Sequence, residues 1–125
     1  MKVLSFVFLF VFAVSISAQS TKVDDLFSEG TRLANAGRFD AALTSYKAAL
    51  NMAENEYLDA GYRARLRFNT GVCYFRLGQF DRAVGEFKRA ILLRKDYAQA
   101  HDALSVAEAR KRESKLSTAS FKASK

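Results

Sequence analysis

The sequence predicts an all-α protein made of two antiparallel helical hairpins and one final capping helix. A pattern starting at Gly30 returns 41 residues later at Gly71, and both copies read Gly-x-x-(Leu/Tyr)-x-x-x-Gly-x-Phe-Asp-x-Ala. The apolar residues after each copy recur with the spacing of one face of an α-helix. The chain also has no proline, the residue that most often interrupts a helix.

The first eighteen residues are expected to lie outside this fold as a secretory signal peptide. A basic start at Lys2 precedes an apolar run over residues 3–16, and small residues close the segment at Ala18. The alternating phenylalanines of this run are also typical of a strand, and a retained membrane anchor is a further alternative. The apolar run is short for an anchor, because a spanning helix needs about twenty apolar residues.

The remaining residues are expected to form one domain over 19–113. Within it, the repeat units cover about 23–56 and 64–97, and a capping helix covers about 97–112. Residues 114–125 lack helical periodicity and predict a flexible basic tail. The expected helices are 22–36, 39–55, 59–77, 80–94 and 97–112.

Positions that recur in both units predict where the helices end and how closely they pack. Gly37 and Gly78 are expected to adopt the left-handed conformation that terminates a helix. Asp40 and Asp81 follow in the first turn of the next helix, where negative charge is favourable. Gly30 and Gly71 lie inside helices, where glycine costs about 1 kcal/mol, which indicates that two helices approach closely there.

The repeated positions make the chain resemble tetratricopeptide repeat proteins. That family's 34-residue unit has small residues at positions 8, 20 and 27, and large apolar residues at positions 11, 17 and 24. The first unit supplies Gly30, Ala42, Ala49, Leu33, Phe39 and Tyr46, and the second supplies Gly71, Ala83, Ala90, Tyr74, Phe80 and Phe87. The resemblance implies a short right-handed solenoid. An ordinary amphipathic helical bundle is the alternative.

The chain departs from the family's pattern in three respects. The period is seven residues longer, and the additional residues fall near 57–63 and are expected to extend both facing helices by about one turn. Glu54 and Lys95 replace the proline that usually closes a unit. Arg67 stands where the first helix of a unit commonly has an aromatic residue.

The resemblance implies that the protein presents a concave groove, lined by the first helix of each hairpin, to a peptide or to a partner's helix. The residues implied for this groove are Phe27, Thr31, Asn35, Arg65, Phe68, Asn69, Val72, Phe75, Arg76, Asp102 and Val106. An apolar stripe with an arginine rim is typical of binding hot spots. Alternatively, Phe68 and Phe75 belong to the core, and Arg65 and Arg76 form a solvated face.

Some relatives bind a C-terminal carboxylate through a clamp of lysine, asparagine and arginine residues. Asn69 matches that clamp, but Phe27, Thr31, Gln99 and Ala103 occupy its other places. The sequence therefore does not favour that function.

The sequence favours a protein that is not an enzyme and needs no cofactor or metal. Cys73 is the single cysteine and is expected to be a buried apolar residue, with a reactive thiol or an intermolecular disulfide as alternatives. His101 is the single histidine and is expected in helix packing or at the surface. No second ligand stands three or four residues from it.

An exported adaptor that binds a protein or peptide is the leading hypothesis, with the periplasm as its expected location and secretion as the alternative. The formal net charge of +7 is concentrated near the end of the chain, where residues 111–125 hold five basic residues and one acidic residue. The nearly balanced helical body and the expected export disfavour nucleic acid as a partner. Two further hypotheses are binding of a polyanion or membrane surface through the tail, and self-association as a structural subunit.

Overall fold

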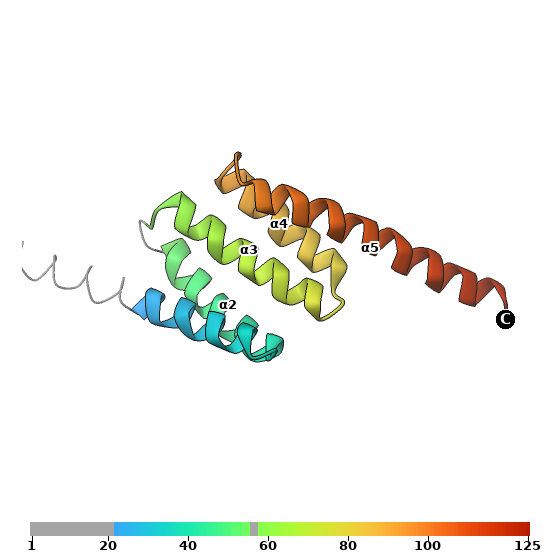
Figure 1. The fold of residues 1–125 in the computed structure, drawn as a ribbon, viewed down its shortest axis with the longest axis horizontal. Coiled ribbons are helices and arrows are strands. Elements are labelled where there is room, and N and C mark those ends of the chain that lie inside the picture. Colours follow the sequence, from blue (N-terminus) through green and yellow to red (C-terminus); the bar gives the residue numbers. More distant parts are fainter. Residues whose placement is uncertain (1–21, 56–57) are drawn as a thin grey trace, which may run out of the picture.

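The computed structural model describes residues 22–55 and 58–125, and this part of the chain is helical apart from short connections (Figure 1). A helix over the described residues 22–35 forms the first hairpin with the helix that follows it. The further elements are α2 (Phe39–Asn55), α3 (Ala60–Arg76), α4 (Phe80–Leu93) and α5 (Ala98–Ala123). These bounds confirm the predicted all-α class and the first four helices to within about a residue at each described end.

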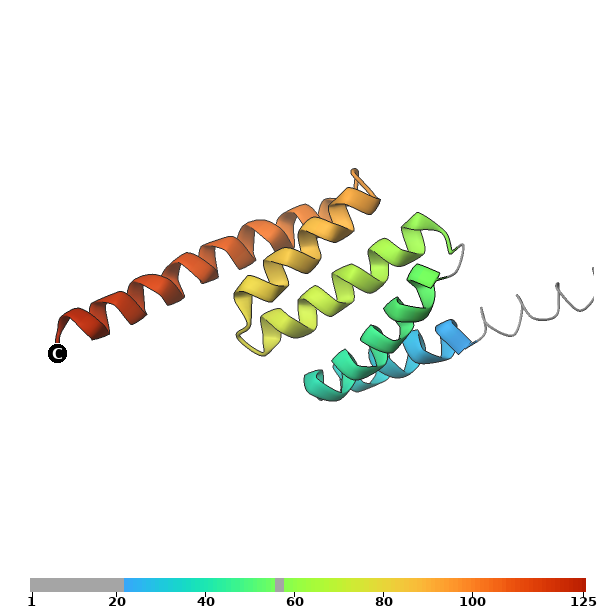
Figure 2. The same ribbon diagram turned by 180° about the vertical axis from the view of Figure 1, so that it is seen from behind.

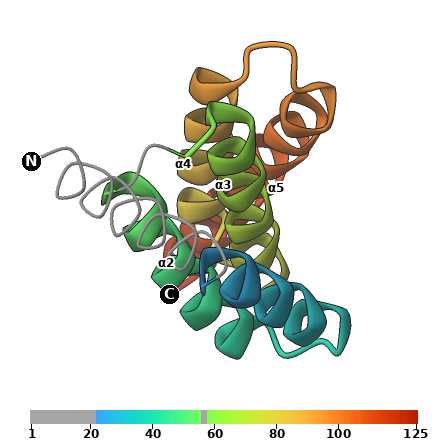
Figure 3. The same cartoon turned by 90° about the vertical axis from the view of Figure 1, so that its left-hand side faces the viewer.

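The two hairpins stack side by side, and α5 packs along the second one, as the opposite views show (Figures 1 and 2). Residues 22–35, α3 and α5 run in one direction, and α2 and α4 run in the other. The end-on view shows these helices as successive layers (Figure 3). We call the face formed by residues 22–35, α3 and α5 the groove face.

Both predicted glycine turns are present. Gly37 and Gly78 each have a φ of 75°, a backbone conformation that residues with a Cβ rarely adopt. Beyond the first glycine, the N–H of Arg38 donates to the carbonyl of Leu33 at 2.9 Å, and Gln79 repeats this bond to Tyr74 at 2.9 Å. These bonds satisfy carbonyls at the helix ends, so each glycine sets the reversal of its hairpin.

The glycines inside the helices allow a close contact with an aromatic ring. A Cβ built on Gly30 would lie 2.6 Å from the ring of Tyr46, and one built on Gly71 would lie 2.7 Å from the ring of Phe87. Both rings are almost fully buried. Glycine lowers the helix propensity at these two positions, but it allows an aromatic ring to pack against the backbone of the neighbouring helix.

The longer period is accommodated within the helices, as predicted. The helices α2 and α3 each have 17 residues, whereas α4 has 14. The side chain of Asp59 accepts a hydrogen bond from the N–H of Tyr62 at 3.2 Å, which caps the start of α3.

Two departures from the family's pattern compensate for each other. Arg67, in the usual aromatic position, forms an ion pair with Glu54, which stands in the usual proline position. The same guanidinium contacts Glu86 at 3.1 Å, and Glu86 also pairs with Arg89 at 2.7 Å. The buried carboxylate of Glu86 is thus paired with an arginine on each side. At the repeat positions that usually hold an aromatic residue and a proline, an ion pair links the two hairpins.

The prediction for the end of the chain was wrong in one respect. The last helix does not end near residue 112, because α5 continues to Ala123 and projects beyond the second hairpin (Figures 1 and 2). No glycine or proline occurs after Gly85, so nothing supplies the left-handed turn that ends the earlier helices. Lysine, alanine, leucine and glutamate in this segment also favour helix. Residues 114–123 are therefore an exposed helix.

The expected signal peptide over residues 1–18 lies outside the described residues. Within the described ranges, no helix is both long and apolar enough to cross a membrane.

Candidate functional site

An apolar pocket opens between α3 and α5 on the groove face. Its volume is about 190 Å³, and its floor is formed by α4. All five lining residues are apolar: Val72, Phe75, Phe87, Ala103 and Val106. The structure thus brings together three of the predicted groove residues. Phe87 and Ala103 were not among the predicted groove residues: Phe87 stood at a large apolar position of the repeat, and Ala103 occupied one of the places of the carboxylate clamp.

Phe75 and Phe68 have different surroundings, although both were predicted to line the groove. Phe75 lines the pocket, and its ring meets Phe80 edge-on at a centroid distance of 5.3 Å. Phe68 lies against Phe87 at 5.7 Å and against Tyr97 at 5.2 Å. Phe68 packs between α3, α4 and the start of α5, the arrangement given above as the alternative to a place in the groove.

Two arginines of α3 are held on aromatic rings while remaining exposed. The guanidinium carbon of Arg65 lies 5.9 Å from the ring centre of Phe27 and 5.3 Å from that of Tyr62. The guanidinium of Arg76 lies 5.3 Å from the ring centre of Phe39. Both arginines remain exposed beside these rings, so their charges are accessible to an anion.

The first helix contributes mainly support for the groove face. The hydroxyl of Thr31 lies 2.9 Å from the carbonyl of Phe27, to which it donates, and 3.1 Å from the hydroxyl of Tyr46. Asn69 also lies near the hydroxyl of Tyr46 and acts to lower its pKa. Burial raises the pKa of Tyr46, although both of these neighbours act in the opposite direction. Thr31 and Asn69 therefore lie against a buried tyrosine.

The other predicted groove residues lie at the edges of the groove face. Phe27 is half-buried and packs against Tyr46 and Tyr62 at centroid distances of 5.9 and 5.7 Å. Asn35 and Asp102 are exposed. Val106 is 53% exposed although it lines the pocket, so it forms the rim on the side of α5.

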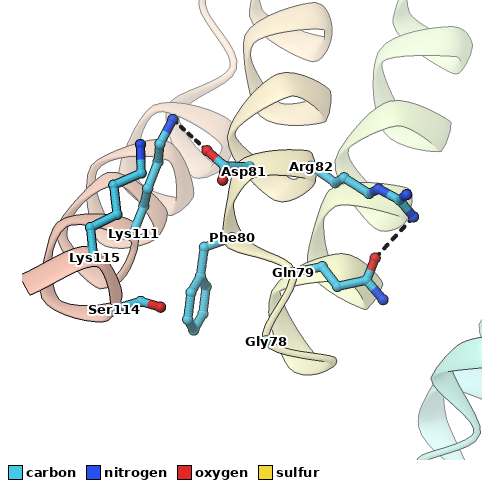
Figure 4. A pocket seen from close by; sticks show the side chains of 8 residues that line it. All are labelled: Gly78, Gln79, Phe80, Asp81, Arg82, Lys111, Ser114 and Lys115. Carbon is cyan, nitrogen blue, oxygen red and sulfur yellow. Dashed lines mark hydrogen bonds and ion pairs between the residues drawn. The ribbon is translucent and has the colours of Figure 1, made fainter. Parts of the chain in front are cut away.

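A second cavity, the overhang cavity, lies where α5 projects past the turn between α3 and α4 (Figure 4). Its volume is about 330 Å³, and its lining residues are Gly78, Gln79, Phe80, Asp81, Arg82, Lys111, Ser114 and Lys115. The ammonium of Lys111 lies 2.6 Å from a carboxylate oxygen of Asp81, and this bond lowers the pKa of Asp81. The ring of Phe80 links this cavity to Phe75 of the apolar pocket.

A third cavity of about 230 Å³ lies around the ion pairs that join the hairpins. Its lining residues are Leu50, Glu54, Arg63, Arg67, Arg89, Leu92 and Leu93. Its one carboxylate, that of Glu54, pairs with Arg67, and Arg67 and Arg89 both pair with Glu86, which does not line the cavity.

The groups that could carry reactive chemistry are either buried or dispersed. Cys73 is buried, as predicted, and burial raises its pKa to about 11. His101 is exposed, and its Nε2 lies 2.8 Å from the carbonyl oxygen of Lys95. Across residues 22–55 and 58–125, no three histidine, cysteine, aspartate or glutamate side chains are grouped in a way that could hold a metal ion.

Comparison with known proteins settles the family. The model described as tetratricopeptide repeat matches residues 31–96, which is more than half of the chain. The chain belongs to the tetratricopeptide repeat family. This is a protein-interaction fold, and the match covers both glycine turns and the whole second hairpin.

Two solved structures share this fold, and one curated protein is similar in sequence. The first tetratricopeptide domain of Spaghetti (RPAP3), bound to the HSP90 peptide SRMEEVD, aligns with a TM-score of 0.65 at 23% identity, covering 75% of this chain and 71% of that chain. The second such domain, bound to the same peptide, gives 0.66 at 18%, covering 85% and 94%. The Protein CTR9 homolog of Arabidopsis thaliana is 30% identical over 95 residues. That match takes in 76% of this chain but spans only 8% of the relative.

Proposed function

We propose that this protein is an exported, non-enzymatic adaptor that binds a peptide or protein segment on its groove face. The observation that carries the proposal is the apolar pocket, whose walls come from two parallel helices and whose surroundings include ring-stacked arginines. A small apolar pocket with a polar rim is the usual form of a hot-spot site. The peptide-bound tetratricopeptide domains that share this fold give further support.

The mode of binding is expected to differ from a clamp on a terminal carboxylate. Ala103, which occupies one of the clamp places, lines the apolar pocket and has no polar group for a carboxylate. We therefore expect an internal segment to bind. Peptide SRMEEVD with a free or an amidated C-terminus should show no difference in affinity for the full chain, and a strong preference for the free carboxylate would contradict this mode.

Two substitutions on α5 test the groove directly. Val106→Asp places a charge at the rim of the apolar pocket, whereas Ser105→Asp places the same charge on a neighbouring exposed position that does not line it. Cross-linked complexes are recovered from cells that express each full-length variant. We expect Val106→Asp to remove most of the cross-linked partner and Ser105→Asp to retain it. Equal recovery with both variants would refute a groove-bound partner.

Export forms the second part of the proposal. It is supported by the basic start, the apolar run and the small residues that precede Gln19. N-terminal sequencing of the protein from the exported fraction should give a chain that begins at or within two residues of Gln19. A chain that retains Met1 in the membrane fraction would favour an anchor instead.

A second candidate function is binding of an anionic surface through the projecting part of α5. Three lysines share one face of this helix, since they stand at intervals of four and seven residues: Lys111, Lys115 and Lys122. Such a lysine face attracts anionic lipid or another polyanion. Deleting residues 114–125 should abolish sedimentation with phosphatidylglycerol vesicles in low salt, and unchanged sedimentation would exclude this function.

A further inference from the structure

We propose a second binding site, for a small molecule that joins a single carboxylate to an aliphatic tail, as a fatty acid does. The site is the third cavity described above, which we call the arginine cavity. Its lining residues come from α2, α3 and α4. The end-on view places α2 and α4 on one side of α3 and α5 on the other (Figure 3). The arginine cavity is therefore separate from the apolar pocket of the groove face.

The arginine cavity arises from the features in which this chain departs from the repeat pattern. Glu54 and Arg67, which stand in the usual proline and aromatic positions, both line it. Arg63 also lines it and belongs to the additional residues that lengthen the period. The charged lining is thus particular to this chain, and membership of the family does not imply it.

The charges around the cavity leave one arginine without a carboxylate. Three guanidiniums line it, those of Arg63, Arg67 and Arg89. Glu54 and Glu86 both pair with Arg67. Glu86 also pairs with Arg89. Two negative charges therefore balance two of the three positive charges, and none of the ion pairs within the described ranges includes Arg63.

Arg63 also has an unfilled hydrogen-bonding group. Its Nε is buried and has no hydrogen-bond partner in the part of the chain that the structure describes. A buried donor without a partner destabilises the folded chain, and a ligand that accepts its hydrogen bond would remove that cost. A carboxylate can accept hydrogen bonds from two nitrogens of one guanidinium at once. We therefore expect Arg63 to hold the headgroup.

Arg89 offers a second contact, and the charge balance selects the kind of headgroup. The Nη1 of Arg89 donates to Glu86 at 2.7 Å, and its side chain is 58% exposed, so its other nitrogens can reach a ligand. A carboxylate brings one negative charge, which matches the one unpaired arginine. A phosphate ester with two negative charges would leave one of them uncompensated close to Glu54 and Glu86.

Three leucines define the apolar part of the ligand. Leu50, Leu92 and Leu93 line the cavity together with the arginines. Leu92 is 78% exposed, and an aliphatic tail that leaves the cavity across it would remove this apolar surface from water. The volume of about 230 Å³ exceeds the roughly 150 Å³ of an engineered cavity that holds benzene. The headgroup and the first carbons of the tail can therefore enter the cavity.

Isothermal titration calorimetry on the full chain tests the site, with decanoate as the probe at neutral pH and below its micelle concentration. Acetate supplies the headgroup alone. Decyl phosphate and decyltrimethylammonium supply the same tail with a phosphate and with a cation. We expect decanoate to bind at one site per chain and decyl phosphate to bind more weakly by about fivefold or more. Acetate and decyltrimethylammonium should show no binding over the same concentrations.

Two pairs of variants locate the bound probe. Arg63→Gln should weaken decanoate by about tenfold or more, because a charged hydrogen bond is lost. Arg112→Gln removes the same charge from an exposed position on α5 and should change the affinity by less than about twofold. Leu92→Gln should weaken decanoate by about fivefold. Leu116→Gln, at another mostly exposed leucine, should leave the affinity unchanged.

The outcomes distinguish this site from the groove. Val106→Asp alters the apolar pocket and should not affect decanoate, so the proposed function and this inference fail independently. The inference is overturned if decanoate does not bind, if Val106→Asp abolishes its binding, or if decyl phosphate binds equally well. Equal effects of Arg63→Gln and Arg112→Gln would overturn it too. Thermal unfolding checks that Arg63→Gln is folded, and the exposed Leu92 keeps the test decisive if it is not.

Discussion

The contact between Gly71 and Phe87 is the smallest feature on which the fold depends. A hydrogen in place of a Cβ lets a buried ring lie against the backbone of the neighbouring helix, and Gly30 with Tyr46 repeats the contact. The ring of Phe87 also forms the floor of the apolar pocket. The same residue therefore links the packing of the second hairpin to the shape of the candidate site.

Gly71→Ala is expected to destabilise the protein although alanine favours helix. The added Cβ would lie 2.7 Å from the ring of Phe87, and overpacking of this kind costs about 1–3 kcal/mol. The gain in helix propensity offsets about 1 kcal/mol of this cost. The expected result is a lower Tm, by up to about 8 °C for a net loss of 1 kcal/mol.

Gly85→Ala is the matched control for this prediction. A Cβ at Gly85 would meet nothing within 4 Å, so this change within α4 should leave the Tm unchanged or raise it. Thermal unfolding followed by circular dichroism measures both variants. If Gly71→Ala is as stable as Gly85→Ala, the close contact is not the reason for the glycine.

Cys73 predicts a dependence of stability on pH. Burial raises the pKa of its thiol to about 11, whereas in the unfolded chain the thiol has its ordinary pKa near 8.5. The stabilisation is complete below about pH 8.5 and is lost as the pH rises toward 11, because only the unfolded chain ionises readily in that window.

Urea unfolding at pH 8 and pH 10 under reducing conditions tests this dependence. Cys73→Ala should lose less unfolding free energy between the two pH values than the unchanged chain does. Buried tyrosines with raised pKa values, such as Tyr46, add to the loss at higher pH in both proteins. An identical loss in both would show that the thiol is not protected by folding.

At the scale of the element, α5 is a helix with two different parts. Up to Lys111 it packs on the second hairpin, with Ala100 and Ala107 buried and Lys111 paired with Asp81. Residues 112–123 are exposed, including Leu116 at 70% and Phe121 at 63%. The second part owes its helical state to local propensity and to continuation of a formed helix.

Deletion of residues 114–125 should therefore lower the helical content without affecting the fold. We expect a smaller circular dichroism signal at 222 nm and a Tm within about 2 °C of that of the full chain, because no buried contact is removed. A large fall in Tm would show instead that the projecting segment packs on the domain.

The sequence predicted the elements that depend on local signals. The glycines at 37 and 78 and the apolar spacing determine where the first four helices begin and end. The end of α5 was missed because periodicity reports burial on one face, and an exposed helix has no such face. Likewise, the partnership of Glu54 with Arg67 joins residues of different hairpins, which no local pattern could indicate.

The candidate site was predicted only in part, because local signals indicate the face of a helix but not the contacts between helices. Val72, Phe75 and Val106 were placed on the groove face by their register within the repeat, and the structure brings them together. For Phe68 the sequence left groove and core open, because its position relative to Phe87 and Tyr97 depends on how α4 and α5 cross α3. Register gives the face of a helix, whereas the depth of a side chain depends on its neighbours in three dimensions.

At the scale of the whole molecule, the basic charge and the apolar pocket occupy separate regions. Most of the excess positive charge lies on residues 111–125, a range that includes the projecting part of α5. The pocket lies nearer the start of that helix. A single long helix can therefore carry an interaction site at one end and a polyanion-attracting face at the other.

Site-specific photo-cross-linking tests the central claim, that the groove face binds the partner, most directly. A photoreactive phenylalanine analogue replaces Val106 at the rim of the pocket in one full-length protein and Arg112, on another side of the same helix, in a second. After irradiation of cells, we predict a discrete cross-linked protein from position 106 and little or none from position 112. Equal cross-linking at the two positions, or cross-linking at position 112 alone, would contradict the account.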